Sequence, residues 1–198
     1  MHQMKKLPTG KNSNNRFVCM AAAIIMLCLM SGCYGKITGT VVDAETGRPI
    51  EGAVVLAEWT KTHGIGDHQT EVYKVIEKLT DSAGKVTLEG VPDILIAPPG
   101  VTVYKKGYVA WNNEYVFPDN KKRTDFKWKD GYVFKLEKFK PEYSYIDHQS
   151  FVYSAINSTI GGASEKQLFL QAYSSGEENQ IILERSKRDE MNMRGDVR

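Results

Sequence analysis

The chain has 198 residues, of which 26 are Lys or Arg and 24 are Asp or Glu, and 41% of all residues are hydrophobic. The basic residues are interspersed with acidic ones, so the sequence shows no basic stripe and we expect no nucleic acid among its partners. A chain of this length can form one domain with an appendage and bury a core without disulfide or metal cross-links.

The first 32 residues have the pattern of a secretory signal. The basic residues before Cys33 are Lys5, Lys6, Lys11 and Arg16, and no acidic residue accompanies them. An apolar run follows from Phe17 to Met30, which is shorter than the about 20 residues that a membrane-spanning helix needs. We therefore predict that residues 1–32 are a cleavable signal peptide.

The segment Met30-Ser31-Gly32-Cys33 resembles the lipobox of bacterial lipoproteins, although Met30 stands where Leu is usual. Small residues let the signal peptidase approach the backbone just before the cysteine that receives the lipid. The resemblance implies that acylated Cys33 anchors the chain to a lipid bilayer. Because Tyr34 is not an aspartate, it implies the outer membrane in a Gram-negative cell. The alternatives are an uncleaved apolar anchor and a signal cut nearby without lipidation.

Processing would change the chemistry of the chain. Cys19 and Cys28 lie in the predicted signal and Cys33 would carry lipid, so the mature protein would have no free thiol, disulfide or thiolate metal site. Removal of the four basic residues would leave 22 basic against 24 acidic residues, a net charge of −2.

Residues 33–140 have the pattern of a mainly β domain. Apolar residues alternate with polar ones in short runs that Gly and Pro separate. The predicted strands are residues 36–41, 53–57, 71–79, 85–89, 101–108, 115–117 and 132–136. A polar stretch at 61–70 interrupts them. Several short strands at regular spacing favour a sandwich or a barrel over a parallel sheet.

Residues 141–198 have a helical pattern and a charged tail. The apolar residues at helical spacing are Phe151, Val152, Ala155, Ile156 and Ile160. Ser144 is the predicted N-cap, and Gly161-Gly162 ends this first helix. A second helix is predicted from Ser164. Its apolar side holds Leu168, Phe169, Ala172 and Tyr173, and Ile181-Ile182-Leu183 continues or restarts it. Residues 185–198 are expected to fray. We expect both helices to pack on a sandwich face, with Trp111 or Tyr115 in the contact.

Two motifs in the β region have a recognisable spacing. The first is Ile37-x-Gly39-x-Val41-x-Asp43 with Thr46-Gly47-x-Pro49-Ile50-x-Gly52-Ala53-x-Val55, and the second is Thr80-Asp81-x-x-Gly84-x-Val86-x-Leu88 with Val101-x-Val103-x-Lys105-x-Gly107-Tyr108. Together they resemble the carboxypeptidase regulatory-like domain over about residues 35–110. The resemblance implies a small transthyretin-like β-sandwich, with a C-terminal helical appendage added here, but no activity. In that family such domains accompany peptidases, precede outer-membrane receptors or stand alone.

The sequence departs from the family pattern by an insertion from Trp59 to Thr70, and residues after Val109 lie outside the pattern. The turn chemistry is independent of the resemblance. Asp43 and Thr46 can bond to the backbone of the first turn while Gly47 reverses the chain, and Gly84 closes an Asp-x-x-Gly hairpin. Gly107 is expected at positive φ.

Few residues indicate catalysis or a cofactor. His63, Asp67 and His68 could ligate a metal, but their Gly-rich setting favours an exposed loop. Asp43, Glu45 and Asp81 could suggest calcium, which turn chemistry explains more simply. Ser150 lies near His148 in sequence but has no evident acid partner, and no metalloprotease or hydrolase motif occurs. We predict no cofactor, no metal and no catalytic residue.

The aromatic residues permit two interpretations. Trp59, Trp111 and Tyr115 could form an exposed platform for a ligand such as a sugar, whose ring suits a flat apolar face. The alternative is that they pack in the core. Our leading hypothesis is a non-enzymatic, membrane-anchored binding or structural module of the cell envelope, with another envelope protein or a glycan as partner. The runner-up is a carbohydrate-binding envelope lipoprotein, and an envelope hydrolase is a distant third.

Overall fold

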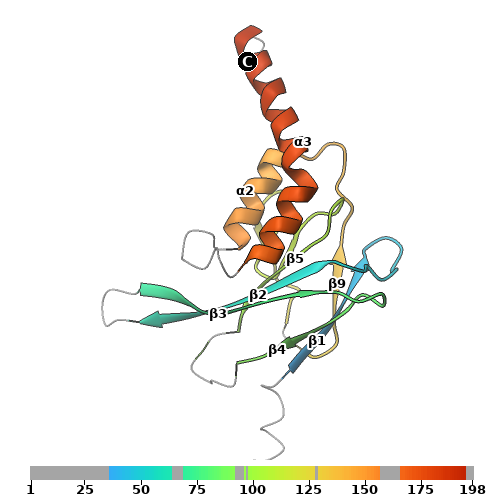
Figure 1. Cartoon of the computed structure of the whole chain (residues 1–198), viewed down its shortest axis with the longest axis vertical. Helices are drawn as coiled ribbons and strands as arrows, with labels where there is room; N and C mark the ends of the chain where they lie inside the picture. The colour runs from blue at the N-terminus through green and yellow to red at the C-terminus, as the bar shows by residue number, and fades with distance from the viewer. Residues whose placement is uncertain are drawn as a thin grey trace, which may run out of the picture. The chain divides into compact units, whose positions relative to one another are not determined.

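Strands followed by two helices make up the described part of the chain (Figure 1). The computed structural model describes residues 36–63, 69–91, 96, 98–127, 129–156 and 166–194, and the predicted signal and Cys33 lie outside them. The strands are β1 Lys36–Asp43, β2 Val54–His63, β3 Gln69–Leu79, β4 Lys85–Glu89, β5 Gly100–Tyr104, β6 Trp111–Asn112, β7 Tyr115–Val116, β8 Lys121–Lys122 and β9 Tyr132–Leu136. The helices are α2 Tyr145–Ala155 and α3 Gln167–Arg194.

Two sheets hold the main core between them. Sheet A has the strand order β4-β1-β9 and sheet B has the order β3-β2-β5-β6, while β7 and β8 form a separate pair. β9 runs parallel to β1, and the other paired strands of both sheets are antiparallel. The shared core contains Val41, Val55, Ala57, Val86, Leu88, Val101, Val103, Phe134 and Leu136. This arrangement confirms the predicted β-sandwich.

The predicted turn chemistry is present in both hairpin motifs. Asp43 Oδ1 accepts hydrogen bonds from the N–H groups of Glu45 and Thr46 at 3.0 and 2.8 Å. The Gly84 N–H donates to Asp81 O, and Gly84 has a φ of +69°. A side chain at Gly84 would also overlap the carbonyl of Val41. Glycine at position 84 therefore permits the positive φ of this turn, and it also lets the turn approach the backbone of β1 closely.

The region predicted as a polar insertion is largely strand. Residues 60–63 of β2 pair with residues 69–72 of β3, beyond a register shift between Trp59 and Thr60. Thr and other polar residues suit a pair of strands whose two faces are both exposed to solvent. Such strands need no apolar alternation, so the polar sequence here was wrongly interpreted as a loop. The strand predicted over 101–108 instead ends at Tyr104, because a turn follows and Gly107 takes the expected positive φ, +84°.

Sheet B is covered on both faces, which explains the continuous apolar run in β2. Val55 and Ala57 face sheet A, whereas Val54 and Leu56 belong to a second core beneath the helices. Such uninterrupted runs are typical of strands buried on both sides. The second core also contains Tyr104, Phe117, Phe151, Val152, Ile156, Phe169, Tyr173 and Ile181. The prediction that the helices pack on the sandwich is therefore confirmed. Of the two aromatic residues expected in this contact, Trp111 belongs to the core between the sheets and Tyr115 is not part of the second core.

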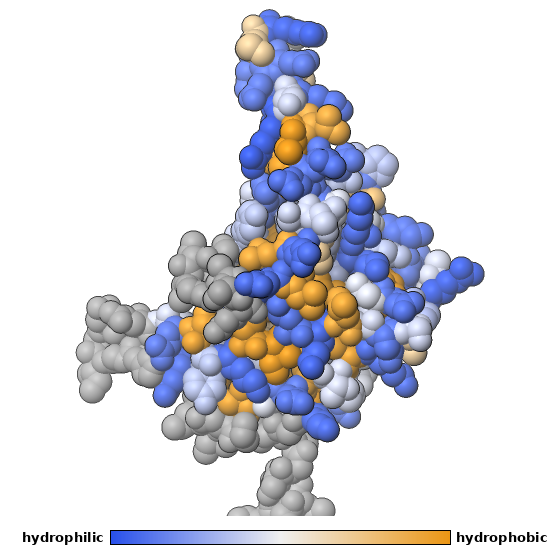
Figure 2. Space-filling view, viewed as in Figure 1, coloured by the Kyte–Doolittle hydropathy of each residue, from blue (hydrophilic) through white to orange (hydrophobic). Residues whose placement is uncertain are grey.

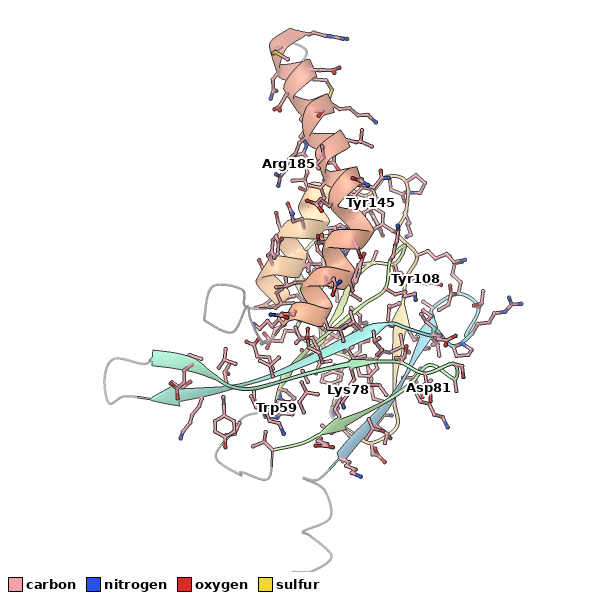
Figure 3. The ribbon with its side chains drawn as sticks, in the orientation of Figure 1. Trp59, Lys78, Asp81, Tyr108, Tyr145 and Arg185 are labelled. Carbon is pink, nitrogen blue, oxygen red and sulfur yellow. The ribbon has the colours of Figure 1, made fainter. Side chains whose placement is uncertain are left out.

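The ends of the two helices differ in how well sequence predicted them. Ser144 is the N-cap of α2, and its hydroxyl accepts from the Asp147 N–H at 3.1 Å, as predicted. α3 continues as a helix to Arg194, past residue 185 where the charged tail was expected to begin. Arg185 instead donates to Gln149 of α2 at 2.7 Å (Figure 3). Among the described residues, no helix is both long and apolar enough to cross a membrane.

Apolar side chains reach the surface along the outer part of α3 (Figure 2). The exposed ones on this helix are Ile182, Leu183, Met191 and Met193. They alternate with charged residues of both signs, so they form separate apolar groups and not one continuous stripe.

Candidate functional site

The predicted aromatic platform does not exist as an exposed surface. Trp59 and Trp111 are only 3% and 5% exposed, and both belong to the core between the sheets. Trp111 lies at the sandwich edge and contacts the rings of Phe126, Tyr132 and Phe134. The platform prediction is therefore wrong for both tryptophans, because their strands direct these large rings inward, where they bury the most apolar area.

Tyr115 is the exposed member of the three predicted residues, at 45% exposure. It lines a groove of about 310 Å³ between sheet B and the end of α2. Its other lining residues are Leu56, Glu58, Thr60, Pro98, Gly100, Thr102, Asn112, Glu114, Ser154, Ala155 and Ile156. We call this the Tyr115 groove. The groove places hydroxyl and carboxylate side chains in one lining with the Tyr115 ring.

A buried histidine–carboxylate pair joins the two helices. His148 of α2 and Glu177 of α3 are both buried, and His148 Nδ1 lies 2.8 Å from Glu177 Oε2. The other ring nitrogen, Nε2, accepts a hydrogen bond from the Ala110 N–H at 2.9 Å. Because Nε2 accepts, the ring proton is on Nδ1, where it is donated to Glu177.

Two tyrosines surround this pair. Tyr104 of β5 and Tyr173 of α3 are buried, and their rings lie 5.1 Å apart. Burial first, and the nearby Glu177 carboxylate second, raise the pKa of both phenols. Both tyrosines therefore stay neutral across the physiological range.

The geometry of this cluster gives it a structural role. A general base needs a free lone pair on its ring, and both nitrogens of His148 are already bonded. Ser150, the serine nearest in sequence, donates to the Ile146 carbonyl one turn earlier at 3.1 Å. The cluster thus holds α2 against Ala110 and α3. Because both ring nitrogens are hydrogen-bonded, His148 can be fully buried.

A buried ion pair lies at the start of α3. The Lys166 ammonium contacts the Glu58 carboxylate of β2 and donates to the Ile156 carbonyl at the end of α2. Lys166 is 1% exposed and Glu58 is 7% exposed. A buried charge is tolerated when it is paired and hydrogen-bonded, so Lys166 joins one strand and both helices.

Carboxylates from other elements cap both helices. Glu77 of β3 accepts from the N–H groups of Leu168 and Phe169 at the start of α3, at 2.9 and 2.7 Å. Glu184 of α3 accepts from the Tyr145 N–H and the Ser144 hydroxyl at the start of α2, each at 2.7 Å (Figure 3). Each carboxylate satisfies free N–H groups and lies at the positive end of a helix dipole.

A larger groove, of about 430 Å³, lies where the two sheets separate. Val109, Ala110, Trp111, Val116 and Phe117 form its mainly apolar floor, and Ala44, Arg123, Asp125, Tyr132, Val133, Lys135 and Glu137 complete its lining. We call this the β9 groove. The Arg123 guanidinium stacks on Trp111 at 4.6 Å from the ring centre and donates to the Asn112 carbonyl at 2.7 Å. The groove therefore combines an apolar floor with a rim that carries both signs of charge.

No protein-family model matches the chain, and no curated protein matches it. Among solved structures, a streptococcal ancillary pilin is similar over 55% of this chain and 30% of its own, at 15% identity and a TM-score of 0.28. A 9R-lipoxygenase from Cyanothece is similar over 62% of this chain and 22% of its own, at 17% identity and a TM-score of 0.29. The chain thus spans less than a third of either protein. The resemblance to the regulatory-like domain stays a prediction.

The remaining sequence-predicted residues divide into two groups. Cys33, Asp67 and His68 lie outside the described residues, as does the side chain of His63. Asp43 and Asp81 accept hydrogen bonds within their own turns, as the turn interpretation predicted. Within the described part of the chain, no group of three His, Cys, Asp or Glu residues could hold a metal ion.

The sequence analysis did not predict the two buried polar pairs, His148–Glu177 and Lys166–Glu58. His148 and Glu177 are 29 residues apart, and Lys166 and Glu58 come from a helix and a strand far apart in sequence. A weak signal existed for the first pair, because His148 and Glu177 stand on the apolar sides of their helices beside Phe151 and Tyr173. A polar residue at such a position requires a buried partner.

Proposed function

We propose that this chain is a lipid-anchored, non-enzymatic binding module of the cell envelope, built on a regulatory-like β-sandwich. The observation that carries the proposal is the segment Met30-Ser31-Gly32-Cys33, which follows the apolar run and ends three residues before β1 begins at Lys36. A tether this short spans roughly 10 Å when extended, so a lipid on Cys33 would hold the sandwich beside the bilayer.

The polar residues of the sandwich and helices support a binding role. His148, Glu177, Lys166 and Glu58 are buried in contacts that join the helices to sheet B. The two grooves are instead lined by residues of several strands, which form a stable frame for a ligand. Sites on regular elements of a folded scaffold are well suited to binding because little order must be gained.

Metabolic labelling tests the anchor. In a bacterial host that receives radioactive palmitate, we expect the wild-type chain to take up label in the membrane fraction. Cys33→Ala should lose the label and accumulate as a larger precursor. Cys28→Ala is the matched control, since it changes a cysteine of the predicted signal and should keep the label. A wild-type chain without label would overturn the proposed anchor.

Carbohydrate binding is a second candidate function, favoured by the Tyr115 groove. Its exposed aromatic ring lies beside Thr60, Glu114 and Ser154. We expect glycan-array binding by the wild type to fall at least about tenfold in Tyr115→Ala, since stacking on the ring would be lost. Tyr73→Ala removes an equally exposed tyrosine of β3 and should have no effect. An array without any signal would reject this candidate.

A further inference from the structure

The β9 groove contains an incomplete sheet edge. β9 pairs with β1 on one side, and among the described residues its other side is paired only just beyond its C-terminal end. There the Val109 N–H donates to Glu137 O at 2.8 Å, and the Phe139 N–H donates to Gly107 O at 2.9 Å. After Val109 the chain leaves this edge and joins sheet B as β6. The β9 groove is the space between β9 and the segment that runs from Val109 to β6.

The direction of the backbone groups follows from these bonds. Successive residues of a strand present their N–H and C=O groups to opposite edges. The Leu136 carbonyl accepts from the Ala44 N–H on the β1 side, whereas Glu137 and Phe139 bond on the other side. Val133 and Lys135 therefore direct their backbone groups into the groove. Among the described residues, no strand pairs with β9 at these two positions.

We propose that the β9 groove binds an extended peptide segment of a partner protein, which adds to sheet A as a strand beside β9. This inference rests on the proposed function as a binding module and names its class of partner. A peptide in extended conformation offers a row of N–H and C=O groups at the spacing of a strand, and a sugar or a phosphate does not. Added strands of this kind gain affinity from the backbone and specificity from alternate side chains.

The lining of the groove defines the side chains that such a peptide needs. Residues directly opposite one another in a sheet share a face. The peptide residue opposite Phe134 would point inward, over the floor of Trp111 and Phe117, and should be apolar. The residue opposite Lys135 would point outward, and an acidic side chain there would pair with the exposed ammonium. We expect an apolar residue next to an acidic one in the bound sequence.

A second copy of the chain fits this edge less well. An antiparallel pair of β9 strands centred on Lys135 would place two lysines directly opposite each other, which is unfavourable. A register shifted toward Glu137 is blocked, because residues 107–109 already occupy that part of the edge. We commit to a peptide from a different protein and treat a second copy as an outcome of the test.

Selection from a phage-displayed library of random 12-residue peptides tests the proposal. The full chain in detergent micelles is the target, and selected peptides are then synthesised and titrated by isothermal calorimetry. Val133→Pro removes the one N–H at Val133 that points into the groove, and Pro is tolerated at a sheet edge. We expect its affinity for the peptides to fall about tenfold or more, while its melting temperature changes little.

A charge reversal gives a second readout that does not depend on the proline. Lys135→Glu should weaken binding of peptides with an acidic residue and favour a basic one at that position. Lys85→Glu is the matched control, because Lys85 is an exposed lysine on the opposite edge strand of sheet A, and its affinity should equal that of the wild type.

Three results would overturn the proposal. The first is a library from which no peptide is enriched. The second is equal affinity of the selected peptides for the wild type, Val133→Pro and Lys135→Glu. The third is a dimer of the wild type in size-exclusion chromatography that Val133→Pro abolishes, which would assign the edge to a second copy. Palmitate labelling of Cys33 is independent of all three, so the proposed anchor can stand or fail separately.

Discussion

The imidazole of His148 donates to Glu177 across the interface between α2 and α3, and the two side-chain atoms are 2.8 Å apart. Its second nitrogen accepts from the backbone of Ala110, in the segment that leads into β6. One side chain therefore connects two helices and the sandwich. Because both bonds require the neutral ring with its proton on Nδ1, the arrangement selects one tautomer of one residue.

Replacing His148 should be costly. His148→Phe would leave the Ala110 N–H without its acceptor and the Glu177 carboxylate without its donor, and we expect the free energy of unfolding to fall by roughly 2–5 kcal/mol. Glu177→Gln should cost about 1 kcal/mol, because an amide oxygen still accepts from Nδ1. Urea unfolding followed by circular dichroism measures both. The control Glu178→Gln changes the exposed neighbouring carboxylate, and a loss as large as that of His148→Phe would contradict the assignment.

Gly176 should reverse the usual effect of a helix glycine. Replacing glycine by alanine inside a helix normally stabilises a protein by roughly 0.5–1 kcal/mol. A Cβ at Gly176 would overlap the buried Tyr104 hydroxyl, so we expect Gly176→Ala to destabilise the protein by about 1–3 kcal/mol. Tyr104→Phe removes that hydroxyl and should recover part of the loss in the double variant. Thermal melts of the three variants decide this, and a higher melting temperature for Gly176→Ala would show that α3 and β5 are not this close.

The acid side of the stability profile should depend on Asp43. Hydrogen bonds, foremost that from the Thr46 N–H, lower the pKa of Asp43 to about 2, whereas an unfolded aspartate titrates near about 3.9. Because the folded pKa is the lower one, the carboxylate stabilises the fold fully above about pH 4. This stabilisation is lost as the pH falls toward 2.

Comparison with Asp43→Asn isolates this effect. The variant should unfold at a lower urea concentration than the wild type at pH 6. The difference between their urea midpoints should narrow as the pH falls from 4 to 2. Other carboxylates titrate in both proteins and cancel in the difference. A difference in urea midpoints that stays constant over this range would mean that the pKa of Asp43 is the same in the folded and the unfolded protein, which would contradict the hydrogen bonds of its turn.

The helices should unfold together with the sheets. Phe151 is 3% exposed in the core beneath the helices, and Phe151→Ala should cost roughly 3–5 kcal/mol. Tyr153→Ala, on the exposed side of the same helix, should cost well under that amount. Hydrogen exchange on the wild type gives the second measurement, with amides of α2 protected as strongly as those of β2. Rapid exchange across α2 beside a protected β2 would contradict joint unfolding.

The features that sequence predicted well are local ones. The bonds of Asp43 to Thr46, the Ser144 cap and the positive φ of Gly107 each depend on residues within a few positions. The strands predicted over residues 85–89 and 132–136 are β4 and β9, and both have alternating burial. These signals are readable because the residues that make the interaction are adjacent in the chain.

The features that sequence did not predict depend on distant partners. Glu77 caps a helix 91 residues away, and Lys166 pairs with Glu58 on a strand. Trp111 stands on a two-residue strand, which is too short for any period to indicate which way its ring points. The polar half of the β2–β3 hairpin lacks the apolar alternation that marks a half-buried strand, although its residues pair in register.

The capping of α2 by Glu184 bears on the order in which the chain becomes able to fold. A ribosome adds roughly 5–20 residues per second from the N-terminus, so the strands of both sheets exist before residue 184 has been made. Until then the start of α2 lacks its carboxylate. Until Phe169, Tyr173 and Ile181 have been made, Val54, Leu56 and Tyr104 on the outer face of sheet B also have no cover from α3. A chain stopped after β9 but before Phe169 would carry all the described strands with one apolar face of sheet B lacking its cover from α3. Such a product would be a substrate for chaperones and proteases, whatever the quality of its sheets.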